Sequence, residues 1–319
     1  MTEEQAVFIK QRMLSVLDNA QMEFLAETLG MCVENIDIND GRNYIDDFIA
    51  AKRIEGRSEK TLKYYRNVIE KAVDGIGKTV RHITTDDLRK YLSTYQDSKG
   101  SSKVTIDNMR RILSSFFGWL EDEELIIKNP VRRIHKVKAC KVIKEVYTDE
   151  ELEKMRDLCE EIRDVALIDL LASTGMRVGE LVQLDIEDIN FEERECTVLG
   201  KGDKERIVYF DVRSKLHLKQ YLESRNDDNS ALFVSLNAPY KRLKIGGIES
   251  RLRKIGKDFG IDNVHPHRFR RTLATVAIDK GMPIEQLQQL LGHQRIDTTL
   301  QYAMVKQSNV KMAHRKYIG

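Results

Sequence analysis

The sequence predicts a two-domain, mainly α-helical protein with a small antiparallel β-sheet in its C-terminal domain. From about residue 38 to residue 125, apolar residues recur at helical spacing. Between residues 195 and 210 the pattern changes to two strand-like runs joined by a glycine-containing turn. A proline and a run of basic residues separate these regions, and 319 residues are enough for two hydrophobic cores.

The composition is typical of a globular protein, with 41% apolar and 33% charged residues. Since no apolar run approaches the roughly 18 residues that a membrane-spanning helix needs, we expect neither secretion nor membrane insertion. The four cysteines are far apart and show no paired metal-ligand spacing: Cys32, Cys140, Cys159 and Cys196. We therefore expect reduced thiols in a cytoplasmic protein.

The net charge of +2 conceals an uneven distribution. Residues 1–36 carry 2 basic and 6 acidic side chains, residues 37–142 carry 22 and 16, and residues 143–319 carry 29 of each. Residues 128–144, which we call the basic segment, contain no acidic residue and seven basic ones: Lys128, Arg132, Arg133, Lys136, Lys138, Lys141 and Lys144. The middle of the chain is therefore its electropositive part.

Residues 1–36 are predicted to form one amphipathic helix. Their apolar residues follow a helical spacing: Phe8, Leu14, Leu17, Phe24, Leu25 and Leu29. Because this stretch is short and net acidic, we do not expect it to bind phosphate. A role in packing, oligomer contact or autoinhibition fits better.

Residues 37–127 are predicted to form a helical domain of about four helices. Three residues stand where N-caps would begin helices: Ser58, Thr84 and Ser102. Asn129-Pro130 is expected to end the last helix, since the residue before proline avoids helical geometry and proline has no N–H to continue the helix. Residues 128–147 then form an extended basic linker.

The second domain is predicted to span residues 148–319. Thr148 and Glu151 have the spacing of a capping box, which predicts the start of a helix. The apolar residues 165–171 indicate a buried helix, and the turn at Gly175 begins another.

The remaining part of this domain contains the predicted sheet. Residues 196–199 and 206–210 are strand-like and are joined by residues 200–203, which predict a hairpin turn. Residues 231–235 indicate a further short strand, and the rest returns to helical spacing.

Six residues of this second domain are the candidate catalytic set: Arg177, Lys201, His267, Arg270, His293 and Tyr302. If the fold brings them together, five potential hydrogen-bond donors surround one phenol. Such a set is suited to attack on a phosphodiester and poorly suited to most other chemistries. Taken one at a time, each of these residues is more often an ordinary surface or core side chain.

Arg177 stands near the start of a helix, where anions are favoured, and its planar guanidinium matches two phosphate oxygens. Glu180 is interpreted as an orienting residue for this helix start, not as a catalyst. Lys201 lies between two glycines at the predicted hairpin tip, from which a flexible ammonium group can give a proton to a leaving oxygen.

His267 and Arg270 are three residues apart on a helix that begins at Pro266, so both face the same side. The imidazole can donate to one phosphate oxygen while the guanidinium neutralises another. His265 and His267 could instead be a metal-binding pair, but no cysteine or carboxylate stands nearby at zinc-like spacing. We therefore expect no metal.

Tyr302 lies nine residues after His293, inside the apolar-periodic stretch 298–305. A free tyrosine has a pKa near 10, so forming the phenolate at pH 7 costs roughly 4 kcal/mol. Cationic donors close to the phenol would offset that cost, and the assignment of Tyr302 therefore depends on its neighbours.

The strings that contain these residues resemble the tyrosine recombinases, the phage-integrase family that includes Xer recombinases and the integrases of conjugative transposons and phages. They are TGMRVGEL at residues 174–181, GKG at 200–202, HRFR at 267–270, LGH at 291–293 and TTLQY at 298–302. Residues 37–130 resemble the family's SAM-like core-binding domain, so the resemblance covers about four-fifths of the chain. Phe269 stands where leucine is usual and Arg271 where histidine is common, which puts packing details in doubt but not activity.

The resemblance implies a site-specific recombinase that cuts and rejoins DNA through a 3′-phosphotyrosyl intermediate, without ATP or a metal. In it, Tyr302 is the nucleophile, Arg177 and Arg270 clamp the scissile phosphate, His267 and His293 support it, and Lys201 is the general acid. The outcome would be integration, excision or inversion of a mobile or chromosomal element in the bacterial cytoplasm, at the nucleoid.

The resemblance also implies partners. The two domains would clamp double-stranded DNA, and a homo-tetramer would assemble on two DNA sites, aided by accessory DNA-bending or directionality factors. The tail after Tyr302, with its apolar residues Val305, Val310 and Met312, would dock on a neighbouring protomer or fold back on its own domain.

Twelve basic residues are the candidate DNA contacts: Lys60, Lys63, Arg66, Arg132, Arg133, Lys136, Lys138, Lys241, Arg242, Lys244, Arg251 and Arg253. For any one of them, a solvated helix face is the alternative explanation.

Two other functions stay open at this point. A type IB topoisomerase uses a similar set to nick and reseal one duplex without exchanging partners. A catalytically silent DNA-binding protein on the same scaffold would act as a repressor or architectural factor. The complete six-residue set argues against the silent protein, because binding alone does not require Tyr302.

Overall fold

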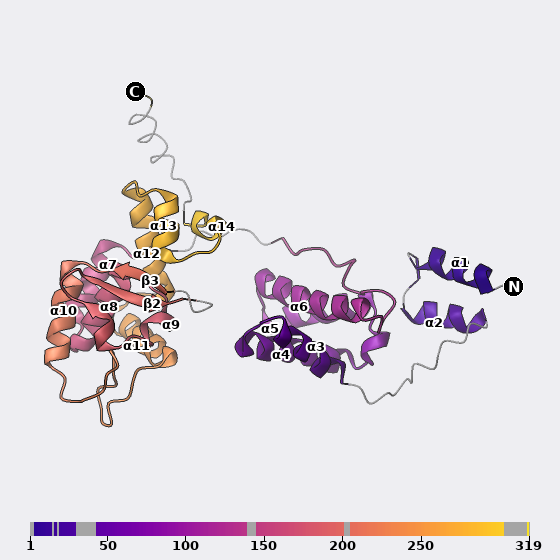
Figure 1. The fold of residues 1–319 in the computed structure, drawn as a ribbon, viewed down its shortest axis with the longest axis horizontal. Helices are drawn as coiled ribbons and strands as arrows, with labels where there is room; N and C mark the ends of the chain where they lie inside the picture. Colours follow the sequence, from indigo (N-terminus) through magenta and orange to yellow (C-terminus); the bar gives the residue numbers. More distant parts are fainter. Residues whose placement is uncertain are drawn as a thin grey trace. The chain divides into compact units, whose positions relative to one another are not determined.

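The computed structural model describes residues 3–14, 16–17, 19–29, 43–138, 145–200, 205–302 and 318. The chain divides into two compact units, Met1–Val142 and Ile143–Gly319, each of which is drawn in Figure 1. Helices dominate both units, and the second also holds a three-stranded antiparallel sheet. The predicted fold class is therefore confirmed.

The first residues form two helices, α1 (Glu3–Met13) and α2 (Asn19–Thr28). The prediction of one helix over this stretch was wrong, because the chain turns after Met13 before it resumes as α2. The backbone near this turn is tied to the rest of the unit, since Lys128 Nζ donates to the carbonyl of Leu14 over 3.0 Å.

The helical domain that follows contains α3 (Tyr44–Ile54), α4 (Glu59–Ile76), the short 3₁₀ helix η1 (Val80–His82), α5 (Thr85–Lys99) and α6 (Lys103–Asp122). All three predicted N-caps are confirmed: the side chains of Ser58, Thr84 and Ser102 each accept the backbone N–H of the third residue of their helix. The four α-helices enclose a core in which Phe48 meets the edge of Phe116, with ring centroids 5.3 Å apart.

The helix α6 ends at Asp122, earlier than the predicted stop at Asn129-Pro130. Glu124, with a φ of 58°, turns the chain out of the helix well before the proline. The first part of the basic segment then packs onto the same core, since Val131 is buried and Val137 donates its N–H to Asp107 over 3.1 Å. Residues 128–138 are therefore not an extended linker, in contrast to the prediction. Residues 139–144 lie outside the described residues.

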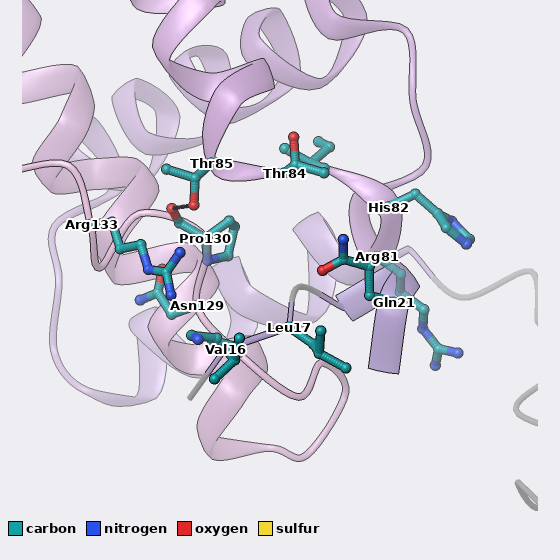
Figure 2. A pocket seen from close by; sticks show the side chains of 12 residues that line it. Val16, Leu17, Gln21, Arg81, His82, Thr84, Thr85, Asn129, Pro130 and Arg133 are labelled. Atoms are coloured by element: carbon teal, nitrogen blue, oxygen red, sulfur yellow. Dashed lines mark hydrogen bonds between the residues drawn. The ribbon is translucent and has the colours of Figure 1, made fainter. Parts of the chain in front are cut away.

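A small pocket lies where this packed segment meets the N-terminal helices (Figure 2). One side is lined by Val16 and Leu17, which lie in the turn between α1 and α2. Another side is lined by Thr84, Thr85 and Arg133. Thr85 donates its hydroxyl to the carbonyl of Pro130 over 2.6 Å. The contact fixes the start of α5 against the basic segment.

The second unit contains eight described α-helices, one 3₁₀ helix and three strands. They are α7 (Asp149–Leu158), α8 (Ile162–Thr174), α9 (Val178–Leu181), η2 (Ile186–Asp188), β1 (Ile189–Asn190), β2 (Glu195–Leu199), β3 (Glu205–Tyr209), α10 (Val212–Glu223), α11 (Ile245–Phe259), α12 (Pro266–Asp279), α13 (Ile284–Leu291) and α14 (Ile296–Leu300). The predicted capping box at Thr148 and Glu151 is present at the start of α7.

The helix α8 is the centre of this unit and is buried along most of its length, as its apolar composition predicts. Two carboxylates on it are also buried and are neutralised by ion pairs. Asp164 contacts Arg163 and Arg251, and Asp169 contacts Arg156 and His217. Helices α7, α10 and α12 pack around α8 (Figure 1).

The sheet has the order β1–β2–β3, with Cys196 opposite Val208 and Val198 opposite Arg206. These four positions face inward, because Cys196, Val198 and Val208 are buried and join the core. The two predicted strands are confirmed, whereas the predicted turn falls largely on residues 201–204, which lie outside the described residues. The predicted strand at 231–235 was wrong: this stretch makes only isolated bridges, at Ala231 and Val234.

In the described parts of the chain, no helix combines the length and the apolar character that crossing a membrane requires. Cys159 and Cys196 are free thiols, and Cys32 and Cys140 lie outside the described residues.

Gly175 ends α8 with a left-handed φ of 59°, and a β-carbon there would lie 2.5 Å from Cδ2 of Leu273. We expect Gly175→Ala to lower the free energy of unfolding by about 2 to 4 kcal/mol, combining backbone strain with overpacking. Gly260→Ala is the matched control, since Gly260 ends α11 with a φ of 67° and a β-carbon there would have no atom within 4 Å. Urea unfolding measures the free energy of unfolding of both variants. Equal decreases in the two would show that the contact with Leu273 contributes nothing.

Candidate active site

Five of the six predicted catalytic residues lie in described parts of the second unit. Arg177 immediately precedes α9, His267 and Arg270 lie on α12, and His293 and Tyr302 follow α13 and α14 respectively. Lys201 lies outside the described residues. Segments more than a hundred residues apart therefore contribute to one site.

Arg270 is the most deeply buried of the five, with 1% of its surface exposed. Its Nη1 donates to the carbonyl of Gly175 over 2.7 Å, and its Nη2 donates to the carbonyl of Leu291 and contacts Nε2 of His293 at 2.9 Å. Burial and the neighbouring Arg177 lower the pKa of Arg270 to about 10, so the group still carries its charge at neutral pH. The guanidinium is thus fixed by backbone from two separate helix ends.

Arg177 is held at the start of α9 by Glu180, as the sequence indicated. The Glu180 carboxylate accepts the backbone N–H of Arg177 over 2.7 Å and its Nη1 over 2.9 Å. Nη2 of Arg177 also donates to the carbonyl of Gly292 over 3.2 Å. Burial acts to raise the pKa of Glu180, but hydrogen bonds from Arg206 and Arg177 hold that pKa below its ordinary value. The side chain of Arg177 is 42% exposed, so it is available to a ligand.

His293 is neutral and has a defined tautomer. Since an arginine can only donate, Nε2 of His293 accepts from Arg270, and Nδ1 therefore carries the proton that is donated to Thr299 Oγ1 over 2.9 Å. Burial and the charge of Arg270 lower the pKa of His293 to about 4. The imidazole is thus a neutral group between a buried guanidinium and a buried hydroxyl.

Tyr302 stacks on His293, with ring centroids 6.0 Å apart and planes 20° from parallel. It also packs against the small cluster formed by Ala274, Leu287 and Leu291. The helix predicted through Tyr302 ends earlier, at Leu300, and the backbone N–H of Tyr302 donates to the carbonyl of Thr299 in a final turn. This turn places the phenol beside the imidazole.

A pocket of about 460 Å³ opens on the same side of the unit. Its lining residues come from the start of α9, from α11 and from the start of α12: Met176, Arg177, Val178, Glu249, Arg253, His265, Pro266, His267 and Arg270. Three arginines against one carboxylate make this lining electropositive, which favours an anion as a ligand. Arg177, His267 and Arg270 thus share one pocket, whereas His293 and Tyr302 do not line it. They are connected to it indirectly, because His293 contacts Arg270 and Tyr302 stacks on His293.

His265 and His267, the pair considered for a metal, both line this pocket. Within the described ranges, His265 and His267 do not belong to any group of three or more potential metal ligands. The donors that converge here are guanidinium and imidazole groups, which suit phosphate oxygens.

Sequence analysis did not identify Arg206 or Thr299 as parts of the site. Arg206 forms a bidentate contact with Glu180, and Thr299 is fully buried against His293. One sequence signal was available for Arg206: it is a charged residue two positions before Val208, so it lies on the same inward-facing side of the strand. For Thr299 we see no such signal.

The predicted DNA-contact residues fall into two groups. Exposed side chains include Lys60, Lys63, Arg132, Arg133, Lys136, Lys138, Lys241, Lys244 and Arg253. Three others are less exposed and form ion pairs within the fold. Arg66 pairs with Asp46 and Glu70, Arg251 pairs with the buried Asp164, and Arg242 pairs with Asp185 and donates to the carbonyls of Val182 and Leu184. The engaged arginines have structural roles, and DNA contact by either group stays a prediction.

The lowered pKa of His293 makes the stability of the second unit depend on pH. Folded His293 is neutral above about pH 4, whereas the unfolded residue takes up a proton below about pH 6.5. The unfolded state therefore binds more protons in this window, and stability falls as pH drops from about 6.5 toward 4. Between pH 6.5 and 4, we expect the free energy of unfolding of His293→Gln to decrease by about 1 to 3 kcal/mol less than that of the wild type.

Urea unfolding of wild-type and variant protein between pH 4 and 7 measures this contribution. The exposed His135 of the first unit provides the control variant, His135→Gln, which should leave the pH profile of the second unit unchanged. Parallel profiles for wild type and His293→Gln would contradict the prediction.

Two solved structures have the same fold as this chain. The site-specific recombinase XerH, bound to palindromic difH substrate in a post-cleavage complex, superposes with a TM-score of 0.68 and 22% identity, over 98% of this chain and 95% of XerH. The integrase of transposon Tn1549, in complex with transposon right-end DNA, gives a TM-score of 0.72 and 18% identity, over 87% of this chain and all of the other.

Sequence comparison assigns the family. Residues 145–309 match the model of the phage integrase family, and residues 44–127 match that of the phage integrase N-terminal SAM-like domain. Tyrosine recombinase XerC of Oceanobacillus iheyensis is 32% identical over 292 residues, which cover 86% of this chain and 95% of the relative. With this match and the site geometry above, the chain belongs to the phage integrase family, the tyrosine recombinases.

Proposed function

We propose that this protein cuts and rejoins double-stranded DNA at specific sites through a covalent bond between Tyr302 and a DNA 3′-phosphate. The observation that carries the proposal is the position of Arg270, which is buried beside the pocket and linked through His293 to the Tyr302 ring. A fixed positive charge one imidazole ring away from a phenol favours attack on a phosphodiester.

In the proposed reaction, the Tyr302 oxygen attacks phosphorus as the phenol releases its proton to water. The bond from phosphorus to the 5′ oxygen breaks, and that oxygen leaves with a proton from Lys201. Arg177 and Arg270 neutralise the non-bridging phosphate oxygens, and His267 and His293 assist them. A partner strand's 5′-hydroxyl reverses the step. Because one phosphodiester replaces another, neither ATP nor a metal is needed.

The two units divide this work in the proposal. Residues 37–127 bind DNA, residues 148–319 carry out the chemistry, and the exposed basic residues of the basic segment add contacts to the duplex. The DNA complexes of XerH and of the Tn1549 integrase support DNA as the ligand. Exchange between two duplexes needs four active sites, so we propose a homo-tetramer on DNA, with accessory DNA-bending or directionality factors. Val305, Val310 and Met312 of the proposed docking tail lie outside the described residues.

Replacing Tyr302 by phenylalanine should abolish the covalent protein–DNA adduct while leaving DNA affinity within about threefold, because the ring that packs on His293 is kept. The adduct is measured by denaturing electrophoresis after incubation with labelled DNA that flanks the coding sequence. Tyr209→Phe is the matched control, since Tyr209 is 55% exposed on β3, and it should form the adduct at the wild-type rate.

An adduct that persists in Tyr302→Phe would refute the nucleophile assignment. The adduct assay, combined with assays of supercoil relaxation and strand joining, separates the other two functions. A silent DNA-binding protein forms no adduct in wild type, and a topoisomerase forms one and relaxes supercoils without joining strands of two duplexes.

Binding of DNA through α4 predicts a defined salt dependence. Lys60 and Lys63 are exposed on α4, and each phosphate that they neutralise contributes about 0.9 to the slope of log affinity against log salt. Changing both to alanine should therefore reduce the slope by about 2. Arg66→Ala is the control on the same helix, and it should change the slope less because Asp46 and Glu70 already neutralise Arg66. Fluorescence anisotropy at several salt concentrations gives the slopes. An unchanged slope in the double variant would exclude α4 from the DNA interface.

A further inference from the structure

Arg206 has no part in the reaction proposed above, yet it connects β3 to the site. Its Nη1 and Nη2 donate to the two oxygens of Glu180 over 2.6 and 2.7 Å, and its Nε donates to the carbonyl of Leu290 over 3.4 Å. The side chain of Arg206 is 13% exposed and that of Glu180 is 5% exposed. This is a buried, bidentate ion pair, the geometry that fixes a carboxylate most strictly.

The same carboxylate holds Arg177. Glu180 Oε1 accepts Nη1 of Arg177, and Oε2 accepts its backbone N–H. Each carboxylate oxygen has lone pairs for two donors, so Arg206 and Arg177 bind Glu180 at once. The plane in which Arg206 holds the carboxylate therefore sets the direction from which Arg177 can contact it.

Gly292 provides a second link between the two arginines. Its carbonyl accepts Nη2 of Arg177, and a β-carbon at this position would lie 2.9 Å from Cδ of Arg206 and 3.0 Å from its Nε. The residue also adopts a left-handed φ of 62°, which suits glycine. The Gly292 backbone thus packs closely against the stem of Arg206 while it positions Arg177.

We propose that Arg206 is a positioning residue that acts through Glu180 and the Gly292 backbone to aim the Arg177 guanidinium at the bound phosphate, without touching the phosphate itself. The inference rests on the proposed function, in which Arg177 binds the scissile phosphate. Arg206 is not among the residues that line the pocket, which fits an indirect role. Lysine cannot replace it, because an ammonium group has no planar fork to match both oxygens of Glu180.

A buried ion pair that only stabilises the fold is the alternative, and the second unit contains a control for it. Arg225 forms a bidentate pair with Asp227, over 3.0 and 2.5 Å, with side chains 6% and 8% exposed. The residues that line the pocket do not include Arg225. Arg225→Lys therefore removes a comparable buried fork without disturbing the contacts of Arg177.

The test is the single-turnover rate of adduct formation at saturating DNA, at a temperature at which circular dichroism shows every variant folded. We expect Arg206→Lys and Arg206→Gln to slow the reaction by about 100-fold, the effect of a misplaced group, with DNA affinity changed by less than about threefold. Arg225→Lys should react at the wild-type rate. Because Arg206 acts through Arg177, adding Arg206→Lys to Arg177→Lys should slow the reaction no further.

Three results would overturn the inference: a wild-type rate for Arg206→Lys, equal slowing by Arg225→Lys, or multiplied losses in the double variant. If Arg206→Gln does not fold, Arg206→Lys against Arg225→Lys decides alone.

Failure of the proposed function is distinguishable, since wild-type protein would then form no adduct. The inference is in that case decided by calorimetric titration with inorganic phosphate. It requires that Arg206→Lys and Arg206→Gln weaken phosphate binding equally and that Arg225→Lys leave it unchanged. If Arg206→Lys binds phosphate with the wild-type affinity, the charge of residue 206 is sufficient and its planar fork is not needed. That result would refute the inference.

Discussion

The burial of one guanidinium, that of Arg270, is the constraint on which the site depends. Its acceptors among the described residues are all neutral: two backbone carbonyls and an imidazole. A buried charge without a carboxylate partner is costly, and that cost is reflected in the lowered pKa of Arg270. The protein keeps the charge because rigid backbone at the ends of α8 and α13 solvates it. An incoming anion then meets a positive charge that needs no rearrangement.

Arg177, unlike Arg270, is held by a carboxylate, that of Glu180. The pocket remains electropositive even so. Glu180 neutralises one charge but is shared between two arginines, so the group as a whole keeps a net positive charge. Burial, together with the positive surroundings, in turn keeps His293 neutral, which allows it to accept from Arg270 and to stack with Tyr302. Each residue of the site thus fixes the protonation state or the orientation of the next.

Local signals in the sequence predicted much of the fold, since they act over a few residues. Ser58, Thr84 and Ser102 each precede a helical pattern, and each caps the helix that follows. The predicted strands β2 and β3 are present, with buried positions two residues apart along β2. Helix ends set by turns were predicted less well. The helix α6 stops before Pro130 because of the backbone at Glu124, which composition does not reveal.

The candidate site was also predicted only where local sequence signals identify its residues. Arg177, His267, Arg270, His293 and Tyr302 stand in motifs that the sequence displays, and their convergence depends on long-range packing that it does not display. Arg206 was missed because its partner, Glu180, is 26 residues away. For the same reason Arg242 and Arg251 could not be distinguished from surface residues, since their carboxylate partners lie 57 and 87 residues away.

In the proposed reaction, the Tyr302 oxygen forms the bond to DNA. This step is tested most directly by trapping the covalent adduct with wild-type protein, digesting the DNA and the protein, and locating the attached nucleotide by peptide mass spectrometry. We expect a 3′-phosphonucleotide on the peptide that contains Tyr302, attached to Tyr302 itself. A nucleotide attached to any other side chain, or through its 5′-phosphate, would contradict it.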